Sequence, residues 1–164
     1  KQGDAGLTVI GAELGHASLP ISVRDALHDV IGPEARRFAT AEDLFSGRGV
    51  SDLHRVVTGG RSDPSHDIVA AASQGKARET VDLLMRLLGK FSRELVFQYL
   101  PLGGMYFAGG VARGALGAQT QATFLSAFDA PGPFADLVAQ VPVRLITDDG
   151  AALTGAARVA VGLP

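Results

Sequence analysis

One segment decides the fold of this chain, Gly103-Gly104-Met105-Tyr106-Phe107-Ala108-Gly109-Gly110. Apolar and aromatic residues stand there between two glycine pairs, which predicts a short buried strand over residues 105–108. Because glycine has no side chain, the paired glycines let a ligand or another part of the chain approach the backbone closely. The segment therefore predicts both a strand of the core and an edge at which a ligand can bind.

The residues after this segment continue an alternation of helices and strands. We predict short helices over 119–128 and 133–140, a second strand over 141–146, and a final helix over 151–161. A strand, a helical connection and another strand imply a right-handed crossover between parallel strands. The C-terminal part of the chain is thus predicted to be α/β.

A single long helix is predicted before the first strand. Apolar residues recur every three or four positions between residues 76 and 99, as one face of a helix requires. The residues of this face are Val81, Leu84, Leu88, Phe91, Leu95 and Tyr99. The helix would be about 36 Å long. A second apolar face at Leu83 and Leu87 predicts packing on two sides, and we expect Gly89 to permit the close approach of another helix.

Shorter helices are predicted in the first part of the chain. Ser22 can cap a helix that runs to about residue 31. Thr40-Ala41-Glu42-Asp43 has the spacing of a capping box, with aspartate in the reciprocal position, and opens a helix that stops at Gly47. Ser51 is the predicted cap of the next helix, and Asp63-Pro64-Ser65 begins another.

The composition indicates one packed domain, or the larger part of one. The chain has 164 residues, of which 46% are hydrophobic and 20% are charged, and this apolar content is sufficient for a core. The formal net charge of −2 and the isoelectric point near 6.1 show no basic footprint, so we predict no nucleic-acid binding. Charged residues interrupt the most apolar long stretch, 81–100, and we therefore predict no membrane span.

The chain contains no cysteine. This excludes disulfides, thiolate zinc sites and thiol nucleophiles, and it fits a reducing cytoplasm. His28, His54 and His66 have no partner at metal-ligand spacing, so we predict surface or helix-face positions for them. We expect no metal site in these residues.

Glu13 and His16 form the first polar motif. They lie three residues apart, just after a predicted strand over residues 7–10, so both side chains can point into one cleft. A carboxylate accepts two hydroxyl hydrogen bonds and an imidazole donates or accepts one, which suits a polyol such as a sugar. The alternative is an exposed loop with two unrelated polar residues.

Glu42 and the glycine pairs are the other candidate site residues. Glu42 lies in the first turn of a predicted helix, where the helix dipole favours a negative charge, so stabilisation of that helix is an alternative to sugar binding. Gly103-Gly104 and Gly109-Gly110 bracket a strand before a helical segment, a junction at which nucleotides commonly bind. The alternative for the glycines is a tight turn, and no Gly-x-Gly-x-x-Gly fingerprint occurs.

Several motifs together resemble the bacterial-type glucokinase family along nearly the whole chain. The motifs span residues 11–16, 41–55, 107–113, 141–146 and 153–157. The resemblance implies an α/β, ribonuclease-H-like fold of the kind shared with hexokinase and actin. It makes residues 1–164 the C-terminal portion of a glucokinase, a large domain with a long central helix that is incomplete at its N-terminal side. The absence of an initiating Met agrees with this expectation of a fragment.

The same resemblance assigns the candidate sites. Glu13, His16 and Glu42 fall on the family's glucose-binding positions. Gly109-Gly110 falls on its adenosine motif, and Gly103-Gly104 should also line the nucleotide cleft. The implied activity is the ATP-dependent phosphorylation of D-glucose to glucose 6-phosphate in glycolysis, with ATP and Mg²⁺ as cofactors. A cytoplasmic homodimer is the implied assembly.

The family's phosphate-binding turn, its second glycine-rich phosphate loop and its catalytic Asp are expected upstream of Lys1. This fragment alone is therefore predicted to be inactive. A related family of repressors and sugar kinases shares the Glu-x-x-His element, but it places a zinc-binding cysteine cluster shortly afterwards, and this chain has no cysteine. The alternative function is a non-catalytic sugar-binding or regulatory domain derived from a sugar kinase. The hexose preference and the phosphoryl donor stay open.

Overall fold

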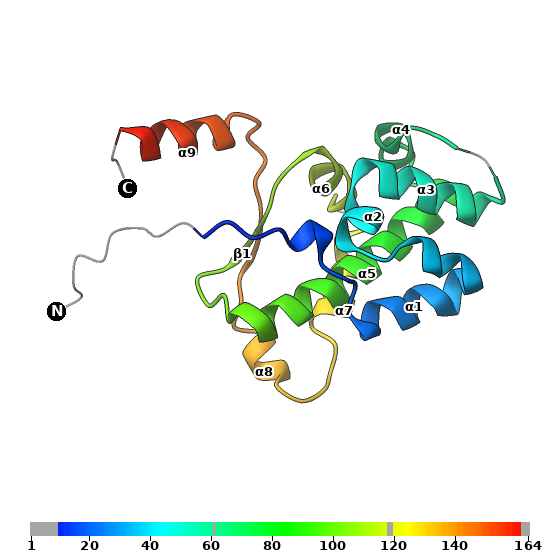
Figure 1. Ribbon diagram of the computed structural model, residues 1–164, viewed down its shortest axis with the longest axis horizontal. Helices are drawn as coiled ribbons and strands as arrows, with labels where there is room; N and C mark the ends of the chain where they lie inside the picture. Colours follow the sequence, from blue (N-terminus) through cyan, green and yellow to red (C-terminus); the bar gives the residue numbers. More distant parts are fainter. Residues whose placement is uncertain (1–9, 61, 118–119, 162–164) are drawn as a thin grey trace.

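The computed structural model describes residues 10–60, 62–117 and 120–161, which form a mostly helical α/β fold (Figure 1). The elements in chain order are η1 (Leu14–His16), α1 (Ile21–Ile31), η2 (Gly32–Arg37), α2 (Ala41–Phe45), α3 (Gly47–Thr58), α4 (Ser65–Ala70), α5 (Gly75–Tyr99), β1 (Met105–Phe107), α6 (Gly110–Ala115), α7 (Gln121–Phe128), α8 (Ala135–Val138), β2 (Val143–Leu145) and α9 (Ala151–Ala160). The helix α5 runs through the helical body and is contacted by α1, α2, α3, α4 and α7. The predicted α/β class with a long central helix is confirmed. None of the described helices combines the length and the apolar character that a membrane span needs.

The position of α5 follows from its two apolar faces. Leu84 and Leu87 are both buried, so the helix is covered on two sides, as the sequence predicts. Gly89 lies against α7: a Cβ added there would be 2.5 Å from the Phe124 carbonyl oxygen and 2.8 Å from the Ala127 Cβ. The predicted close approach of a second helix at Gly89 is therefore confirmed.

The helices α2 and α3 begin at two successive caps. The predicted capping box of α2 is confirmed, because Thr40 Oγ1 accepts from the Asp43 amide and the Asp43 carboxylate accepts from the Thr40 amide. The prediction that Ser51 caps the next helix is wrong. The cap is Ser46, whose hydroxyl oxygen accepts from the Gly49 amide at 3.1 Å. Ser51 lies one turn inside α3 and donates to the Gly47 carbonyl.

We expect acid to weaken the cap of α2. Hydrogen bonds from the Thr40 side chain and then the Thr40 backbone lower the pKa of the Asp43 carboxyl below its ordinary value of 3.8. Because the folded-state pKa is depressed, the carboxylate stabilises the fold fully above pH 3.8, and this contribution is lost as the pH falls through the lower folded-state value. Asp43→Asn should therefore lower the free energy of unfolding by about 1 kcal/mol near neutral pH.

Urea unfolding at about pH 6 and about pH 3 measures this effect, because the difference between Asp43→Asn and the unsubstituted protein should shrink on acidification. Asp52→Asn is the control, since Asp52 pairs with Arg55 on the helix surface rather than with a cap. An undiminished difference for Asp43→Asn at low pH would contradict the assignment.

The sheet of the described residues has two parallel strands. Met105, Tyr106 and Phe107 of β1 pair with Val143, Arg144 and Leu145 of β2. The predicted parallel pairing is confirmed, although both strands are shorter than predicted. The prediction that the first strand is buried is wrong, because its central residue Tyr106 is 56% exposed. The Tyr106 ring instead lies under the Arg144 guanidinium on the outer face of the sheet.

The two ends of the described chain differ from the core. The strand predicted over residues 7–10 lies outside the described residues, except for Ile10, which belongs to no strand. At the other end, α9 has no buried residue and lies apart from the helical body (Figure 1). Its Leu153 is 78% exposed. The core therefore lies around α5 and on the inner side of β1.

Candidate functional site

The turn that carries Glu13 and His16 is joined by backbone hydrogen bonds to the segment that leads into α2. Ser18 and Thr40 form an isolated antiparallel bridge. Beside it, the Ala41 amide donates to the Ala17 carbonyl at 3.2 Å. This pairing brings residues 13–16 next to the first turn of α2, where Glu42 lies.

Glu42 lines a hollow of about 230 Å³ that we call the acidic hollow, and Gly15 from η1 lies beside it. A Cβ added to Gly15 would be 3.5 Å from Glu42 Oε2, so the carboxylate lies against the bare backbone of the turn. Phe45, Phe91 and Phe107 supply apolar walls. A carboxylate that lies at the rim of an aromatic hollow can accept hydroxyl hydrogen bonds from a ligand while its own charge stays solvated.

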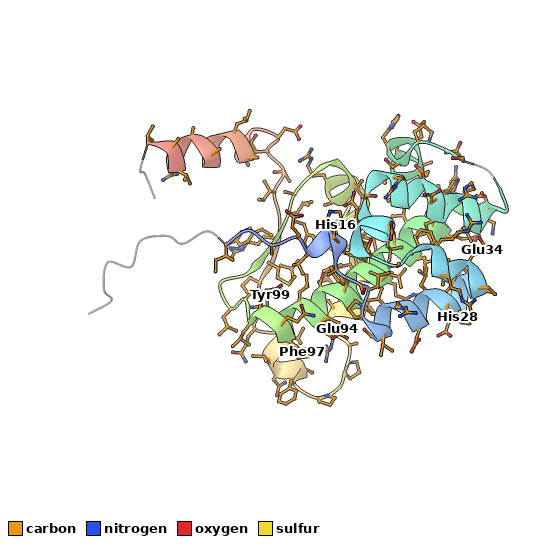
Figure 2. The ribbon with its side chains drawn as sticks, in the orientation of Figure 1. His16, His28, Glu34, Glu94, Phe97 and Tyr99 are labelled. Atoms are coloured by element: carbon orange, nitrogen blue, oxygen red, sulfur yellow. The ribbon has the colours of Figure 1, made fainter. Side chains whose placement is uncertain are left out.

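Glu13 and His16 lie on the flank of this hollow rather than in its walls. Both residues are exposed, and neither is among the residues that line the acidic hollow. Figure 2 shows His16 on the turn beside α2. The structure thus brings the three predicted sugar-binding residues into one neighbourhood, in which only Glu42 contacts the hollow.

A second hollow, of about 320 Å³, lies at the carboxyl end of β1, and we call it the glycine hollow. It is lined by Gly109 and Gly110, and Gly109 has the left-handed φ of 97° that glycine tolerates best. A Cβ added at either glycine would meet nothing within 4 Å, so the backbone there is open to a ligand.

The two hollows adjoin each other. The residues that line both are Phe45, Ser46, Leu88 and Phe107. Glu42 and the Gly109-Gly110 pair therefore line adjoining hollows that share the last residue of β1, Phe107. The chemistry of these shared residues does not identify them as site residues from the sequence. Phe45 and Ser46 belong to a motif, and Leu88 belongs to the apolar face of the long helix.

Gly103 and Gly104 lie at the opposite end of the strand. Gly104 has a φ of 119°, and its backbone packs against the Pro142 carbonyl just before β2. Neither glycine is among the residues that line the glycine hollow. The structure therefore separates the two glycine pairs by the length of β1.

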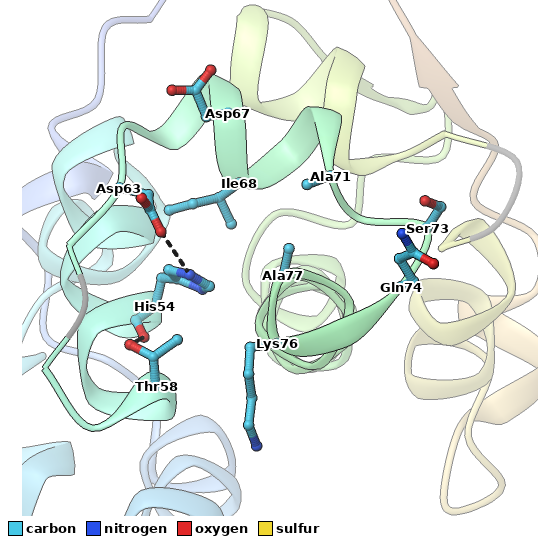
Figure 3. Close-up of a pocket in the computed structure, with 10 residues that line it drawn as sticks. All are labelled: His54, Thr58, Asp63, Asp67, Ile68, Ala71, Ser73, Gln74, Lys76 and Ala77. Carbon is cyan, nitrogen blue, oxygen red and sulfur yellow. Dashed lines mark hydrogen bonds and ion pairs between the residues drawn. The ribbon is translucent and has the colours of Figure 1, made fainter.

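A larger hollow, of about 720 Å³, lies between α3, α4 and the start of α5 (Figure 3). Both ring nitrogens of His54, which lines this hollow, already have partners: Nδ1 is 2.8 Å from Thr80 Oγ1, and Nε2 is 3.3 Å from Asp63 Oδ2. The prediction of a surface or helix-face position for His54 is wrong in one respect, because the side chain is only 4% exposed. The two hydrogen-bonding partners satisfy the buried ring.

His54→Ala should lower the free energy of unfolding by about 2–3 kcal/mol, because it removes the contacts of the ring with Thr80 and Asp63 and leaves a cavity. Chemical denaturation measures this change. His66→Ala is the matched control: His66 also lies beside an aspartate, Asp67, but its side chain is 80% exposed. The control should change stability by less than about 0.5 kcal/mol. Equal effects of the two substitutions would contradict a structural role for the buried imidazole.

Metal-ligand geometry is not found in the described part of the chain. No group of three or more histidine, aspartate or glutamate residues there could hold a metal ion. Aspartate is also missing among the described residues that line the acidic and glycine hollows.

The fold matches that of part of a solved glucokinase. The crystal structure of a glucokinase from an Antarctic psychrotroph superposes on this chain with a TM-score of 0.76 and 23% sequence identity. The superposition covers 94% of this chain and 51% of that one. At this identity the likeness shows the fold alone.

Sequence comparisons show the family. The family model for glucokinase matches residues 2–162. The chain is 31% identical to a glucokinase of Brucella suis biovar 1 (strain 1330) over 172 residues, which cover 92% of this chain and 50% of that protein. It is 29% identical to a glucokinase of Agrobacterium fabrum (strain C58 / ATCC 33970), with 92% of this chain and 47% of that protein covered. The chain therefore belongs to the glucokinase family, and it spans about half the length of the curated relatives it matches.

Proposed function

We propose that the complete protein transfers the γ-phosphate of ATP to the 6-hydroxyl of D-glucose, and that this chain supplies part of the glucose site and part of the adenosine site. The observation that carries the proposal is that the acidic and glycine hollows adjoin at the end of β1 and share four lining residues. Phosphoryl transfer requires a hydroxyl and a nucleotide to be held side by side, so two adjoining hollows suit the reaction.

The sugar would be held at the acidic hollow. Glu42 would accept hydrogen bonds from two hydroxyls of the sugar ring, and the aromatic walls would cover an apolar face of that ring. Glu13 and His16, which lie on the adjoining turn, would contact the sugar when a second domain closes over it. These contacts orient the ring, so that the reacting hydroxyl faces the nucleotide.

The nucleotide would be held at the glycine hollow. The open backbone at Gly109 and Gly110 fits a flat, bulky group such as adenosine, because no side chain blocks the approach. We place Gly103 and Gly104 only at the margin of this site, since they lie at the other end of β1. Mg²⁺ would neutralise phosphate charge when it is bound with the nucleotide, and we assign no residue of this chain as its ligand.

The general base is expected in another part of the complete protein. The described residues that line the two hollows include no aspartate, and Glu42 is assigned to ring hydroxyls. We propose that an Asp upstream of Lys1 takes the proton from the 6-hydroxyl. We further propose a ribonuclease-H-like large domain, action in cytoplasmic glycolysis and a homodimer, all of which follow from the family.

A coupled assay for glucose 6-phosphate on the complete protein tests the proposal, together with calorimetry of glucose binding. We expect turnover that requires both glucose and Mg-ATP. ADP and polyphosphate in place of ATP determine the phosphoryl donor. Glucose binding with no phosphorylation by any donor would contradict the kinase proposal and support a non-catalytic sugar-binding or regulatory domain.

A further inference from the structure

A third hollow, of about 320 Å³, lies between α1 and η2, and we call it the cationic hollow. Arg24 and His28 come from α1, and Arg36 comes from η2. Arg24 and His28 are four residues apart, which places them on the same face of the helix. Figure 2 shows His28 near the end of α1 that faces η2. Two guanidinium groups and an imidazole thus meet at one depression.

The two arginines have no acidic partner in the part of the chain that the structure describes. No ion pair or hydrogen bond of the Arg24 or Arg36 side chain is found there, although the neighbouring Arg37 pairs with Glu34 at 2.5 Å. Elsewhere on the surface, Arg55 pairs with Asp52 at 3.1 Å. Two guanidinium groups that share a hollow without a counter-ion repel each other, so an anion bound between them would relieve that repulsion.

The hollow also contains one carboxylate and one hydroxyl. Asp25 lines it, yet lies beyond ion-pairing distance of both arginines, and Ser18 adds a hydroxyl donor. The formal charge of the lining is positive even with His28 neutral, because two guanidinium groups outweigh one carboxylate. Asp25 can accept a hydroxyl hydrogen bond from a ligand that carries both a phosphate and hydroxyl groups.

We propose that the cationic hollow binds the phosphate group of a small molecule, either inorganic phosphate or a phosphorylated polyol. Guanidinium forks match phosphate oxygens in a bidentate geometry, which a lysine ammonium does not provide. The volume of about 320 Å³ leaves room for more than the phosphate itself. The cationic hollow and the acidic hollow share no lining residue, so the proposed site is distinct from the proposed glucose site.

Calorimetric titration of the complete protein with inorganic phosphate, and separately with glucose 6-phosphate, tests the proposal. Arg24→Gln and Arg36→Gln should each weaken the binding of both probes by about tenfold, because each removes a charge-assisted contact. Asp25→Asn should weaken glucose 6-phosphate binding and leave inorganic-phosphate binding unchanged or tighter. This difference distinguishes a phosphorylated polyol from inorganic phosphate as the ligand. Arg37→Gln is the matched control, since Arg37 lies next to Arg36 but does not line the hollow.

The outcomes separate this inference from the proposed kinase function. Calorimetry detects the site whether or not glucose is phosphorylated, and the arginine variants should keep the unsubstituted protein's turnover at saturating substrates. Thermal unfolding confirms that the variants fold. Arg36→Lys provides a second test, because it keeps the positive charge and removes the bidentate guanidinium group. Binding of inorganic phosphate that survives both Arg→Gln substitutions, or that Arg37→Gln weakens equally, would overturn the proposal, as would the absence of inorganic-phosphate binding.

Discussion

Gly89→Val should lower the free energy of unfolding by about 3 kcal/mol or more, the largest stability effect that we expect in this chain. The three nearest atoms to an added Cβ are the Phe124 carbonyl oxygen at 2.5 Å, the Ala127 Cβ at 2.8 Å and the Phe128 amide nitrogen at 3.1 Å, so the obstacle is the α7 backbone and a rigid Cβ rather than the far end of a flexible side chain. A branched side chain would therefore force α5 and α7 apart. That separation would disturb the stacked rings of Phe124 and Phe128, which lie 5.7 Å apart in the core.

Gly155→Ala is the matched control for this prediction. Gly155 also lies inside a helix, α9, but an added Cβ would meet nothing within 4 Å. Because alanine favours the helix more than glycine does, the control should be neutral or stabilising by up to about 1 kcal/mol. Urea unfolding of both variants measures the difference. If Gly89→Val were as stable as Gly155→Ala, the close contact between α5 and α7 would be contradicted.

Glu42→Gln should reduce kcat/KM for glucose in the complete protein by about 100-fold, the largest effect on activity that we expect from these residues. The amide keeps the shape of the carboxylate, but it replaces one charged acceptor oxygen with a donor. Two hydroxyl hydrogen bonds to the sugar would be weakened or lost as a result. The fold should be retained, because the interaction of the Glu42 charge with the dipole of α2 stabilises the helix by no more than about 1 kcal/mol.

Steady-state kinetics with glucose, beside thermal unfolding, measure both parts of this prediction. Glu34→Gln is the matched control, since Glu34 also lies in the first turn of a helical element but pairs with Arg37 outside the acidic hollow. Glu13→Gln in the same assay should have a smaller effect than Glu42→Gln, because Glu13 does not line the hollow. Kinetics with Glu42→Gln that match those of the control would remove Glu42 from the glucose site.

Local patterns predicted the elements well where the physical signal lies within one turn or one helix. The capping box at Thr40 depends on residues three positions apart, and its hydrogen bonds form as predicted. The central helix depends on a 3.6-residue period sustained over several turns, and it spans Gly75–Tyr99. The error at Ser51 arose because Ser46 offered a second cap, and the choice between two adjacent caps depends on how α2 packs against α3.

The sequence by itself determined the central helix, the close approach at Gly89, the parallel strand pair and the family to which the chain belongs. Only the tertiary structure decided that His54 is buried, that Tyr106 faces outward, and that the hollow lined by Glu42 adjoins the hollow lined by Gly109 and Gly110. The physical reason is the range of the interactions involved. Hydrogen bonds of a cap and the apolar period of a helix act between residues a few positions apart. A hollow, in contrast, forms where segments about 60 residues apart in the chain, such as those of Glu42 and Phe107, come to lie together through packing.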